Sequence, residues 1–202
     1  MSTTEVLEVL FGSKTRARMM RFFILNPKGE YTFPEILRKN LLKSPEARKE
    51  LNIFKKARFT KERKKGGKKY YFINPDFPFY KEIERLIVRS DIFPQCKSLS
   101  MIKKVGNVKL AVTTGVFLNY EKGDVDLLIV VDGVSRAKLK KMIANLEAEV
   151  GREIRYMIID NEELTYRLNM LDRFIIDMFK GPHEIIINKA PKVKQIISRL
   201  EK

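Results

Sequence analysis

The chain has 202 residues, 44% of them hydrophobic, which is enough for one or two domains with a buried core. Its formal net charge of +16 is unevenly placed: residues 1–90 carry 22 Lys and Arg against 10 Asp and Glu, whereas residues 91–202 carry 19 against 15. The net charge of +12 in the N-terminal half favours a polyanionic partner. Nucleic acid is favoured over a membrane surface, because the basic residues accompany helix and hairpin signals rather than one strongly amphipathic helix.

Cysteine and histidine usage excludes several classes of site. Cys96 is the only cysteine, so an intrachain disulfide framework is excluded and a reducing compartment is favoured. The only histidine, His183, follows the helix stop Gly181-Pro182, so we expect it in a loop or at a strand edge rather than as a metal ligand. No apolar run approaches the roughly 20 residues of a membrane span, and residues 1–10 lack the cationic start of a signal peptide. We therefore expect a cytoplasmic protein without membrane association.

Residues 10–75 predict a small domain of three helices and a hairpin. Ser13 is the expected N-cap of a helix over residues 14–25, and a second helix is expected to begin at Thr32 or Phe33. The third helix, over residues 44–56, should have Ser44 as its N-cap and Pro45 in its first position. Its apolar residues recur at helical spacing and should be buried, namely Ala47, Leu51 and Phe54, while its outward side chains should be Arg48, Lys49, Asn52 and Lys56.

The hairpin is expected over residues 59–74, with its tip in the sequence Lys64-Lys65-Gly66-Gly67-Lys68-Lys69. Together with the third helix it forms the most basic part of the chain. Residues 43–69 hold twelve Lys and Arg against three acids. A short basic helix followed by a basic hairpin is typical of a DNA-binding winged helix-turn-helix.

Residues 10–75 resemble winged helix-turn-helix regulators through the segment 32–40, the helix 44–56 and the hairpin 59–74, which ends in Tyr70-Tyr71-Phe72-Ile73-Asn74-Pro75. The resemblance implies that the helix faces a DNA groove and that the hairpin grips neighbouring phosphates. Asn52 can contact adenine and Arg48 guanine through paired hydrogen bonds, whereas Lys binds phosphate as a point charge. The expected DNA-binding residues are Lys43, Ser44, Arg48, Lys49, Asn52, Lys56, Arg63, Lys64, Lys65, Lys68 and Lys69.

After this domain we expect a linker over residues 76–95 and a second domain over residues 96–190. The linker should contain a helix over 79–88 with Ile83, Leu86 and Ile87 on one face. The second domain should alternate strands and helices: strands at 108–113, 125–131, 154–159 and 184–187, a helix after the Ser135 cap up to residue 150, and helical structure from an Asp160/Glu163 capping box to residue 179. A terminal helix is expected over residues 191–202.

The second domain resembles the nucleotidyltransferase superfamily over roughly residues 100–190. The resemblance lies in the turn Gly115-Val116-Phe117, followed by Asp124 and Asp126 at alternate positions of an expected strand. Alternate strand residues share one face, so the two carboxylates could hold one Mg²⁺ for nucleotidyl transfer. Gly115, Asp124 and Asp126 are therefore the expected nucleotide-binding residues, and the two aspartates the expected metal ligands. An ordinary turn with a strand-edge acid remains the alternative interpretation of this pair.

Departures from the family pattern predict that catalysis is lost. Val116 stands where the family has a phosphate-binding Ser, and Arg155-Tyr156 stand where it has a third acid. Glu153 lies at the edge of that strand and is the one candidate to replace the third acid. An Arg facing the two aspartates would neutralise them without metal.

The two halves together resemble small prokaryotic proteins that fuse a winged helix to a nucleotidyltransferase-like domain and are usually taken as transcriptional regulators. The expected fold class is thus α+β, and the expected function is sequence-specific binding of double-stranded DNA in the nucleoid. The second domain would be a non-catalytic sensor or dimerisation domain, with no required cofactor and with a nucleotide effector and a homodimer as open possibilities. The alternatives are an active Mg²⁺-dependent nucleotidyltransferase and an RNA-binding protein.

Overall fold

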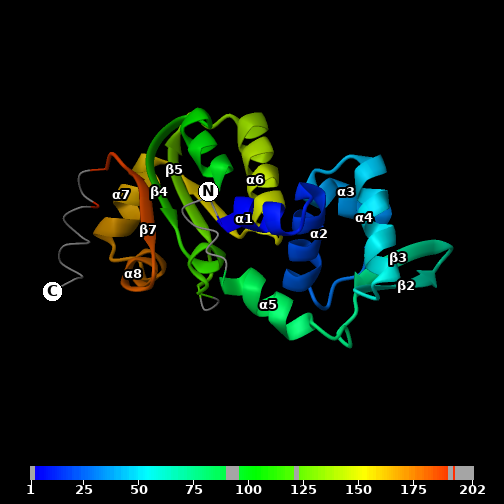
Figure 1. The fold of residues 1–202 in the computed structure, drawn as a ribbon. Coiled ribbons are helices and arrows are strands. Elements are labelled where there is room, and N and C mark those ends of the chain that lie inside the picture. The colour runs from blue at the N-terminus through cyan, green and yellow to red at the C-terminus, as the bar shows by residue number, and fades with distance from the viewer. Residues whose placement is uncertain (1–2, 90–95, 121–122, 191–192, 194–202) are drawn as a thin grey trace. The chain divides into compact units, whose positions relative to one another are not determined.

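The computed structural model describes residues 3–89, 96–120, 123–190 and 193, and these form an α+β structure (Figure 1). The chain divides into two compact units. The first comprises Met1–Gln95 and Ala144–Glu153, and the second comprises Cys96–Ile143 and Ile154–Lys202. The end of the expected linker, at residues 90–95, and all but Val193 of the expected terminal helix lie outside the described residues.

Five helices of the first unit lie in the N-terminal part of the chain: α1 (Thr3–Leu10), α2 (Lys14–Leu25), α3 (Phe33–Asn40), α4 (Ser44–Lys56) and α5 (Tyr80–Arg89). Sequence-local caps begin two of them. The Ser13 hydroxyl accepts a hydrogen bond from Arg16 N at 3.2 Å, and Thr32 and Glu35 form a capping box. These expected helix starts are confirmed. Helix α1 was not anticipated from the sequence.

The start of α4 differs from the expectation by one residue. Lys43, not Ser44, is the N-cap, and Ser44 and Pro45 are the first two helical residues. The helix begins earlier because Lys43 O already accepts the first helical hydrogen bond, from Ala47 N at 3.1 Å. The Pro45 ring tolerates this position, where its missing N–H would have no partner within the helix.

The core of the first unit is aliphatic and aromatic. Met19, Phe23, Ile36, Ala47 and Ile87 are each at most 1% exposed and belong to one cluster that also contains Leu51 and Phe54. The predicted buried side of α4 is thereby confirmed. On α5 the expectation was wrong for Leu86, which is 44% exposed although Ile87 beside it is buried. A helix buries only the stripe that meets its neighbour, and that stripe passes through Ile83 and Ile87, four residues apart.

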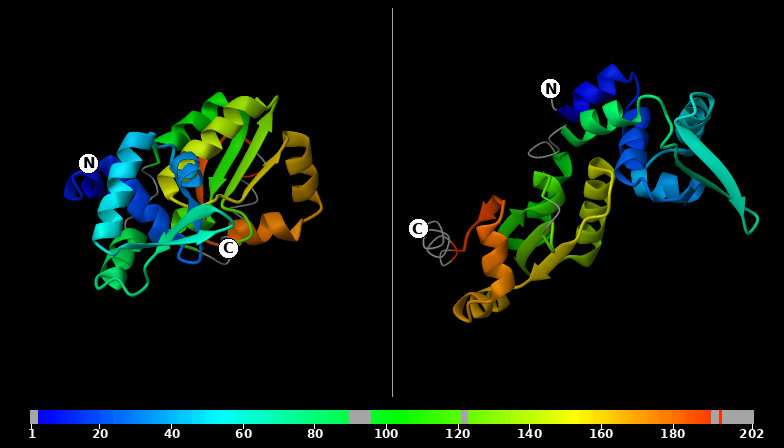
Figure 2. Two further views of the ribbon diagram at one scale, coloured as in Figure 1. Left: turned by 90° about the vertical axis from the view of Figure 1, so that its right-hand side faces the viewer. Right: turned by 90° about the horizontal axis from the view of Figure 1, so that it is seen from below.

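A three-stranded antiparallel sheet completes this part of the unit, in the order β1-β3-β2. Its strands are β1 (Tyr31–Thr32), β2 (Thr60–Lys65) and β3 (Lys68–Ile73). Gly66 and Gly67 join β2 to β3 with φ angles of +55° and +71°, which is why the tip of a two-residue hairpin turn carries glycine at both positions. Figure 2 shows the hairpin of β2 and β3 extending away from helices α2 to α4. The expected hairpin is confirmed, while β1, which pairs with β3, was not foreseen.

The second unit is built on a four-stranded sheet of order β6-β5-β4-β7. Its strands are β4 (Asn107–Thr113), β5 (Leu127–Asp132), β6 (Tyr156–Ile159) and β7 (Glu184–Asn188). Neighbours are antiparallel except for β5 and β6, which are parallel. Strand β5 is fully buried from Leu127 to Val130, as its unbroken apolar run predicts. Helix α6 (Arg136–Val150) follows β5, and its second half, from Ala144, belongs to the first unit.

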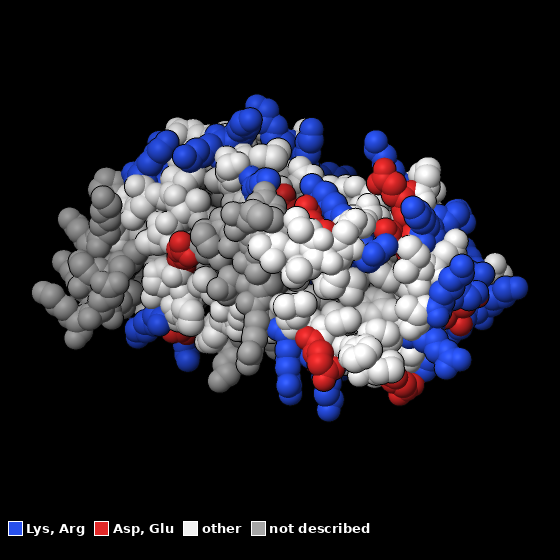
Figure 3. Space-filling view, viewed as in Figure 1, with Lys and Arg blue, Asp and Glu red and all other residues white. Residues whose placement is uncertain are grey.

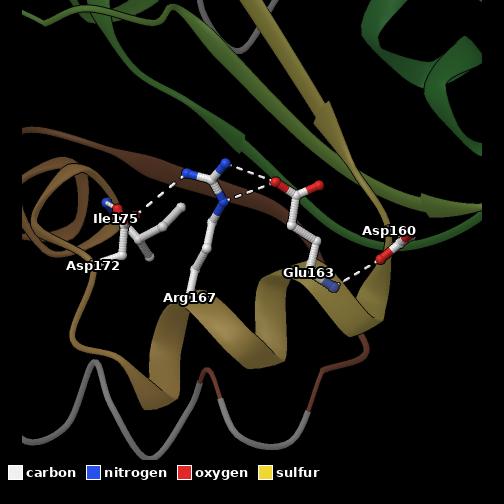
Figure 4. A network of polar contacts seen from close by, with 5 residues as sticks. All are labelled: Asp160, Glu163, Arg167, Asp172 and Ile175. Atoms are coloured by element: carbon white, nitrogen blue, oxygen red, sulfur yellow. Dashed lines mark hydrogen bonds and ion pairs between the residues drawn. The ribbon is translucent and has the colours of Figure 1, made fainter.

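Helices α7 (Asn161–Asn169) and α8 (Arg173–Lys180) pack on one face of this sheet, where Leu164 and Phe179 join a cluster with Leu110 and Leu128. Asp160 caps α7 by accepting from Glu163 N at 2.7 Å, as predicted. The Glu163 carboxylate does not complete the expected capping box, because it binds Arg167 at 2.7 Å, and Arg167 also reaches Asp172, the N-cap of α8 (Figure 4).

Two 3₁₀ helices, at Lys97–Lys104 and Gly115–Leu118, complete the described elements. The first was not predicted. The second occupies the Gly115-Val116-Phe117 turn that the sequence singled out.

Candidate functional site

The exposed face of α4 carries the helix residues that the sequence assigned to DNA binding. Arg48, Lys49, Asn52 and Lys56 are all exposed, as are Lys43 and Ser44 at the start of the helix. None of the four cations among them, Lys43, Arg48, Lys49 and Lys56, forms an ion pair with a described residue. Figure 3 shows Lys and Arg side chains gathered over α4 and the hairpin of β2 and β3.

The acids of α4 are turned towards α2 instead. Glu50 is 5% exposed and accepts a 2.8 Å hydrogen bond from Arg16 Nε, while Glu46 accepts one from the Thr15 hydroxyl at 3.4 Å. These contacts hold α4 against α2. Glu50 is buried by them, whereas Glu46, in the first turn of the helix, stays exposed. Apart from Glu46, the charged residues of this exposed face are cations, and Asn52 adds an amide to it.

Arg48 is the best-positioned cation of this face. Its guanidinium lies over the Phe33 ring, 4.5 Å from the ring centroid. Such stacking stabilises the side chain by about 0.5–1 kcal/mol at an exposed site and restricts its rotamers. The planar group with its fork of N–H donors is thus partly fixed before any ligand arrives. Phe33, from the first turn of α3, is a contributor that the sequence interpretation missed.

The four lysines at the hairpin tip form two directly opposed pairs across the strands. Lys64 pairs with Lys69 and Lys65 with Lys68 across β2 and β3, on either side of the Gly66-Gly67 turn. All four lysines are exposed, and like charges directly opposite one another destabilise a hairpin. Lys64, Lys65 and Lys68 form no ion pair within the described part of the chain. An anion bound at the tip would relieve this repulsion.

Two residues of the hairpin of β2 and β3 (the wing) that the sequence assigned to DNA binding already form ion pairs within the protein. Lys69 Nζ lies 3.4 Å from the Glu62 carboxylate, and Arg63 forms an ion pair with Glu30. The hydrogen bond from Lys55 lowers the pKa of Glu62 against the opposing effect of burial, so this carboxylate stays ionised. Arg63 and Lys69 are therefore less available to an external anion than the three tip lysines.

In the second unit the dominant feature is an ion pair between Asp126 and Arg155. Asp126 is completely buried, and its two oxygens accept from Arg155 Nε at 3.0 Å and from Nη2 at 2.8 Å. The backbone adds two more donors, Arg155 N at 2.9 Å and Val116 N at 3.0 Å. Burial by itself raises the pKa of the Asp126 carboxyl, but these hydrogen bonds outweigh it and leave the pKa below its ordinary value.

Gly115 is required by the close approach of this carboxylate. Its φ is +55°, and a Cβ placed there would lie 1.9 Å from Asp126 Oδ1. The turn therefore wraps closely around the aspartate, and Val116, the next residue, donates its amide to the same oxygen. Asp126, Gly115, Val116 and Arg155 form one packed polar cluster that joins the turn, the start of β5 and the start of β6.

The expectation that Asp124 and Asp126 share one strand face is wrong. Strand β5 begins only at Leu127, so both aspartates precede it, and Asp124 is exposed while Asp126 is buried. Asp124 lines a cavity of about 580 Å³ together with Thr114, Tyr120, Phe174 and Asp177. Neither Gly115 nor Asp126 lines this cavity, so the three expected nucleotide-binding residues do not converge on it.

These residues do not fit a Mg²⁺ site. Both oxygens of Asp126 are engaged by Arg155, whose guanidinium occupies the position that a divalent cation would need, and Asp124 alone supplies too few ligands. Across the described residues, no group of three or more His, Cys, Asp or Glu side chains is placed to hold a metal ion.

Glu153, the candidate third acid, is engaged elsewhere. It belongs to the first unit, where its carboxylate lies 2.7 Å from Lys39 Nζ on helix α3. This hydrogen bond lowers the pKa of Glu153, with the charge of Lys39 acting in the same direction. Glu153 is therefore a partner of Lys39 in this structure.

Compared with known proteins, the chain matches no family model, no curated sequence and no solved structure. In the described part of the chain, none of the helices has both the length and the apolar character to cross a membrane.

Proposed function

We propose that the protein is a sequence-specific regulator that binds double-stranded DNA through α4 and the hairpin of β2 and β3. The observation that carries the proposal is the exposed face of α4, where Arg48 and Asn52 stand among lysines that form no ion pair with a described residue, while Glu50 is buried against Arg16 of α2. Arg and Asn are the side chains that read guanine and adenine through paired hydrogen bonds.

The hairpin supplies the second element that such binding needs. Its tip offers three lysines that form no ion pair with a described residue, on either side of a two-residue glycine turn. Lysine contacts to phosphate fix the protein on the duplex without reading sequence. The order of helices and hairpin agrees with the winged helix-turn-helix resemblance. Binding of chromosomal DNA, and with it a place in the prokaryotic nucleoid, is part of the same proposal.

For the second unit we propose a non-catalytic sensor or dimerisation role. Support comes from the Arg155 guanidinium on Asp126 and from Val116 in place of a hydroxyl residue, because nucleotidyl transfer relies on metal-bound carboxylates and on donors to the phosphates. An aromatic and acidic cavity beside Asp124 offers a place for a small effector.

The direct test is selection of bound fragments from a pool of random duplexes, followed by affinity measurements on the enriched site. A recurring motif bound much more tightly than scrambled duplex and than hairpin RNA at the same salt concentration supports the proposal. Binding without enrichment, or tighter binding of the RNA, would replace it with a general phosphate binder or an RNA-binding protein.

A further inference from the structure

The second unit carries a cationic surface that the proposed DNA-binding face does not include. It consists of six exposed side chains from two elements of this unit, Lys103, Lys104, Arg136, Lys138, Lys140 and Lys141. The first two end the 3₁₀ helix Lys97–Lys104, and the other four lie on the first half of α6. Figure 3 shows Lys and Arg side chains along the upper edge of the view, over the start of α6.

The two elements touch where their cations lie. Ser135 N donates to Val105 O at 2.8 Å, which joins the end of the 3₁₀ helix to the start of α6. Gly106 packs so closely here that a Cβ on it would lie 2.8 Å from Gly133 O. The end of the 3₁₀ helix, with Lys103 and Lys104, therefore lies beside the start of α6, and we call the six exposed cations of these two elements the α6 basic surface.

Among the described residues, no acid forms an ion pair with this surface. The sequence from residue 133 to residue 146 contains no Asp or Glu. Asp132, just before it, is occupied by Lys109 at 3.8 Å and by the backbone amide of Asn161 at 3.2 Å. None of the six cations forms an ion pair with a described residue.

Stability does not explain these charges. Arg136 and Lys138 lie in the first turn of α6, which holds no acid, and the positive end of the helix macrodipole repels cations there by roughly 0.3–1 kcal/mol each. An acid in the first turn would stabilise the helix. Cations that oppose the helix dipole and one another are expected where an external anion compensates them.

The composition of the surface selects the class of anion. Five of its six cations are lysines, which bind phosphate as point charges, and the α6 residue between them on the exposed side is Ala137. Neither the 3₁₀ helix Lys97–Lys104 nor α6 contains an aromatic residue that could stack single-stranded bases. The large apolar residues of α6, Leu139, Met142 and Leu146, are buried and cannot enter a membrane.

We propose that the α6 basic surface binds the phosphate backbone of duplex DNA without reading its sequence. The surface adds a second set of electrostatic contacts to the chain, and it does not depend on α4 reading bases. Each phosphate contact contributes about 0.9 to the slope of log K against log salt concentration, so the surface is measurable by its share of that slope.

The experiment compares two double variants of the full chain, K138A/K141A on the surface and K180A/K189A as the control with the same loss of charge. Lys180 ends α8 and Lys189 follows β7, and both are exposed. Affinity for one random-sequence duplex is measured over a salt series. We expect the slope of K138A/K141A to become less negative by up to about 1.8 and that of the control to stay within about 0.3 of wild type.

Equal slopes for the two variants would overturn the proposal. So would a loss of binding to vesicles of anionic lipid by K138A/K141A with its DNA slope unchanged, which would assign the surface to membranes. Because alanine is a better helix former than lysine, the melting temperature should not fall, and this checks the fold. Failure of the proposed function would look different: no motif would be selected, while the slope difference between the two variants would remain.

Discussion

The Arg155 guanidinium donates hydrogen bonds to both carboxylate oxygens of Asp126, at 2.8 and 3.0 Å. Asp126 thereby acts as a structural anchor of the second unit. The carboxylate is fully buried and joins two segments that are 29 residues apart in the sequence. The buried Asp126 carboxylate has its compensating cation within the chain, the Arg155 guanidinium.

Replacing Asp126 by Asn should destabilise the protein by about 2–4 kcal/mol, because the Arg155 guanidinium and two backbone amides lose a charged acceptor. The loss should depend on pH. Since the pKa of folded Asp126 lies below its ordinary value of about 3.9, the ion pair stabilises fully above about pH 4 and is lost as the pH falls through the folded pKa. Denaturant unfolding at pH 7 and at pH 3 measures both quantities.

The control for that variant is Asp124→Asn, which removes an exposed carboxylate and should change stability by less than about 0.5 kcal/mol. If the two variants lost equal stability, or if the gap between Asp126→Asn and wild type did not shrink at low pH, the anchor role of Asp126 would be refuted.

Gly115→Ala should cost several kcal/mol, because the new Cβ meets Asp126 Oδ1 at 1.9 Å and the backbone has a φ of +55°. Gly66→Ala separates the two causes, since Gly66 has the same φ but no atom within 4 Å of the added Cβ. We expect Gly66→Ala to cost about 1–2 kcal/mol, the backbone strain alone. Thermal unfolding measures the loss of stability in both variants. Equal losses of stability would mean that Gly115 is needed only for its positive φ.

Nucleotide transfer should be absent. The purified protein, incubated with labelled ATP, CTP, GTP or UTP, Mg²⁺ and a cell extract as acceptor, should label nothing, because Asp126 is held by Arg155 and Val116 offers no hydroxyl. Labelling that disappears in both Asp124→Asn and Asp126→Asn would restore the enzyme interpretation. Binding of a nucleotide without turnover would agree with a sensor role.

The wing should act through charge alone. Replacing Lys64, Lys65 and Lys68 together by Ala should make the slope of log K against log salt less negative by up to about 2.7, with equal loss on all duplex sequences. Lys61→Ala is the single-charge control, since Lys61 is already paired with Asp76 at 2.8 Å. An unchanged slope in the triple variant would remove the hairpin tip from the interface.

Local signals explain what the sequence could predict. Helix caps bind amides that are at most three residues away, as at Ser13 and between Thr32 and Glu35. A short stretch of sequence is therefore enough to predict where such a helix begins. The glycine pair at residues 66–67 likewise fixed the hairpin tip. The buried side of α4 followed from the spacing of three apolar residues, since helical periodicity alone orients such a stripe.

Long-range contacts explain what the sequence could not supply. Strand β1 exists because two residues pair with β3, some 40 positions later, and no local pattern announces it. The buried Asp126 is compensated by Arg155, 29 residues later in the sequence. The sequence suggests that an Arg could face this acid but does not show which of its atoms bind. The stacking of Arg48 on Phe33 and the joining of the α6 basic surface at Ser135 and Val105 are of the same kind.

The most direct test of DNA reading is the ratio of affinities for the selected site and for a scrambled duplex, measured at one salt concentration for two variants. Asn52→Ala should lower this ratio by about tenfold, because a lost pair of base contacts costs about 1–3 kcal/mol on the correct site and little elsewhere. The triple wing variant should weaken both duplexes alike and leave the ratio unchanged. A ratio unaffected by Asn52→Ala and by Arg48→Ala, in variants that still bind, would contradict the assignment of base reading to α4.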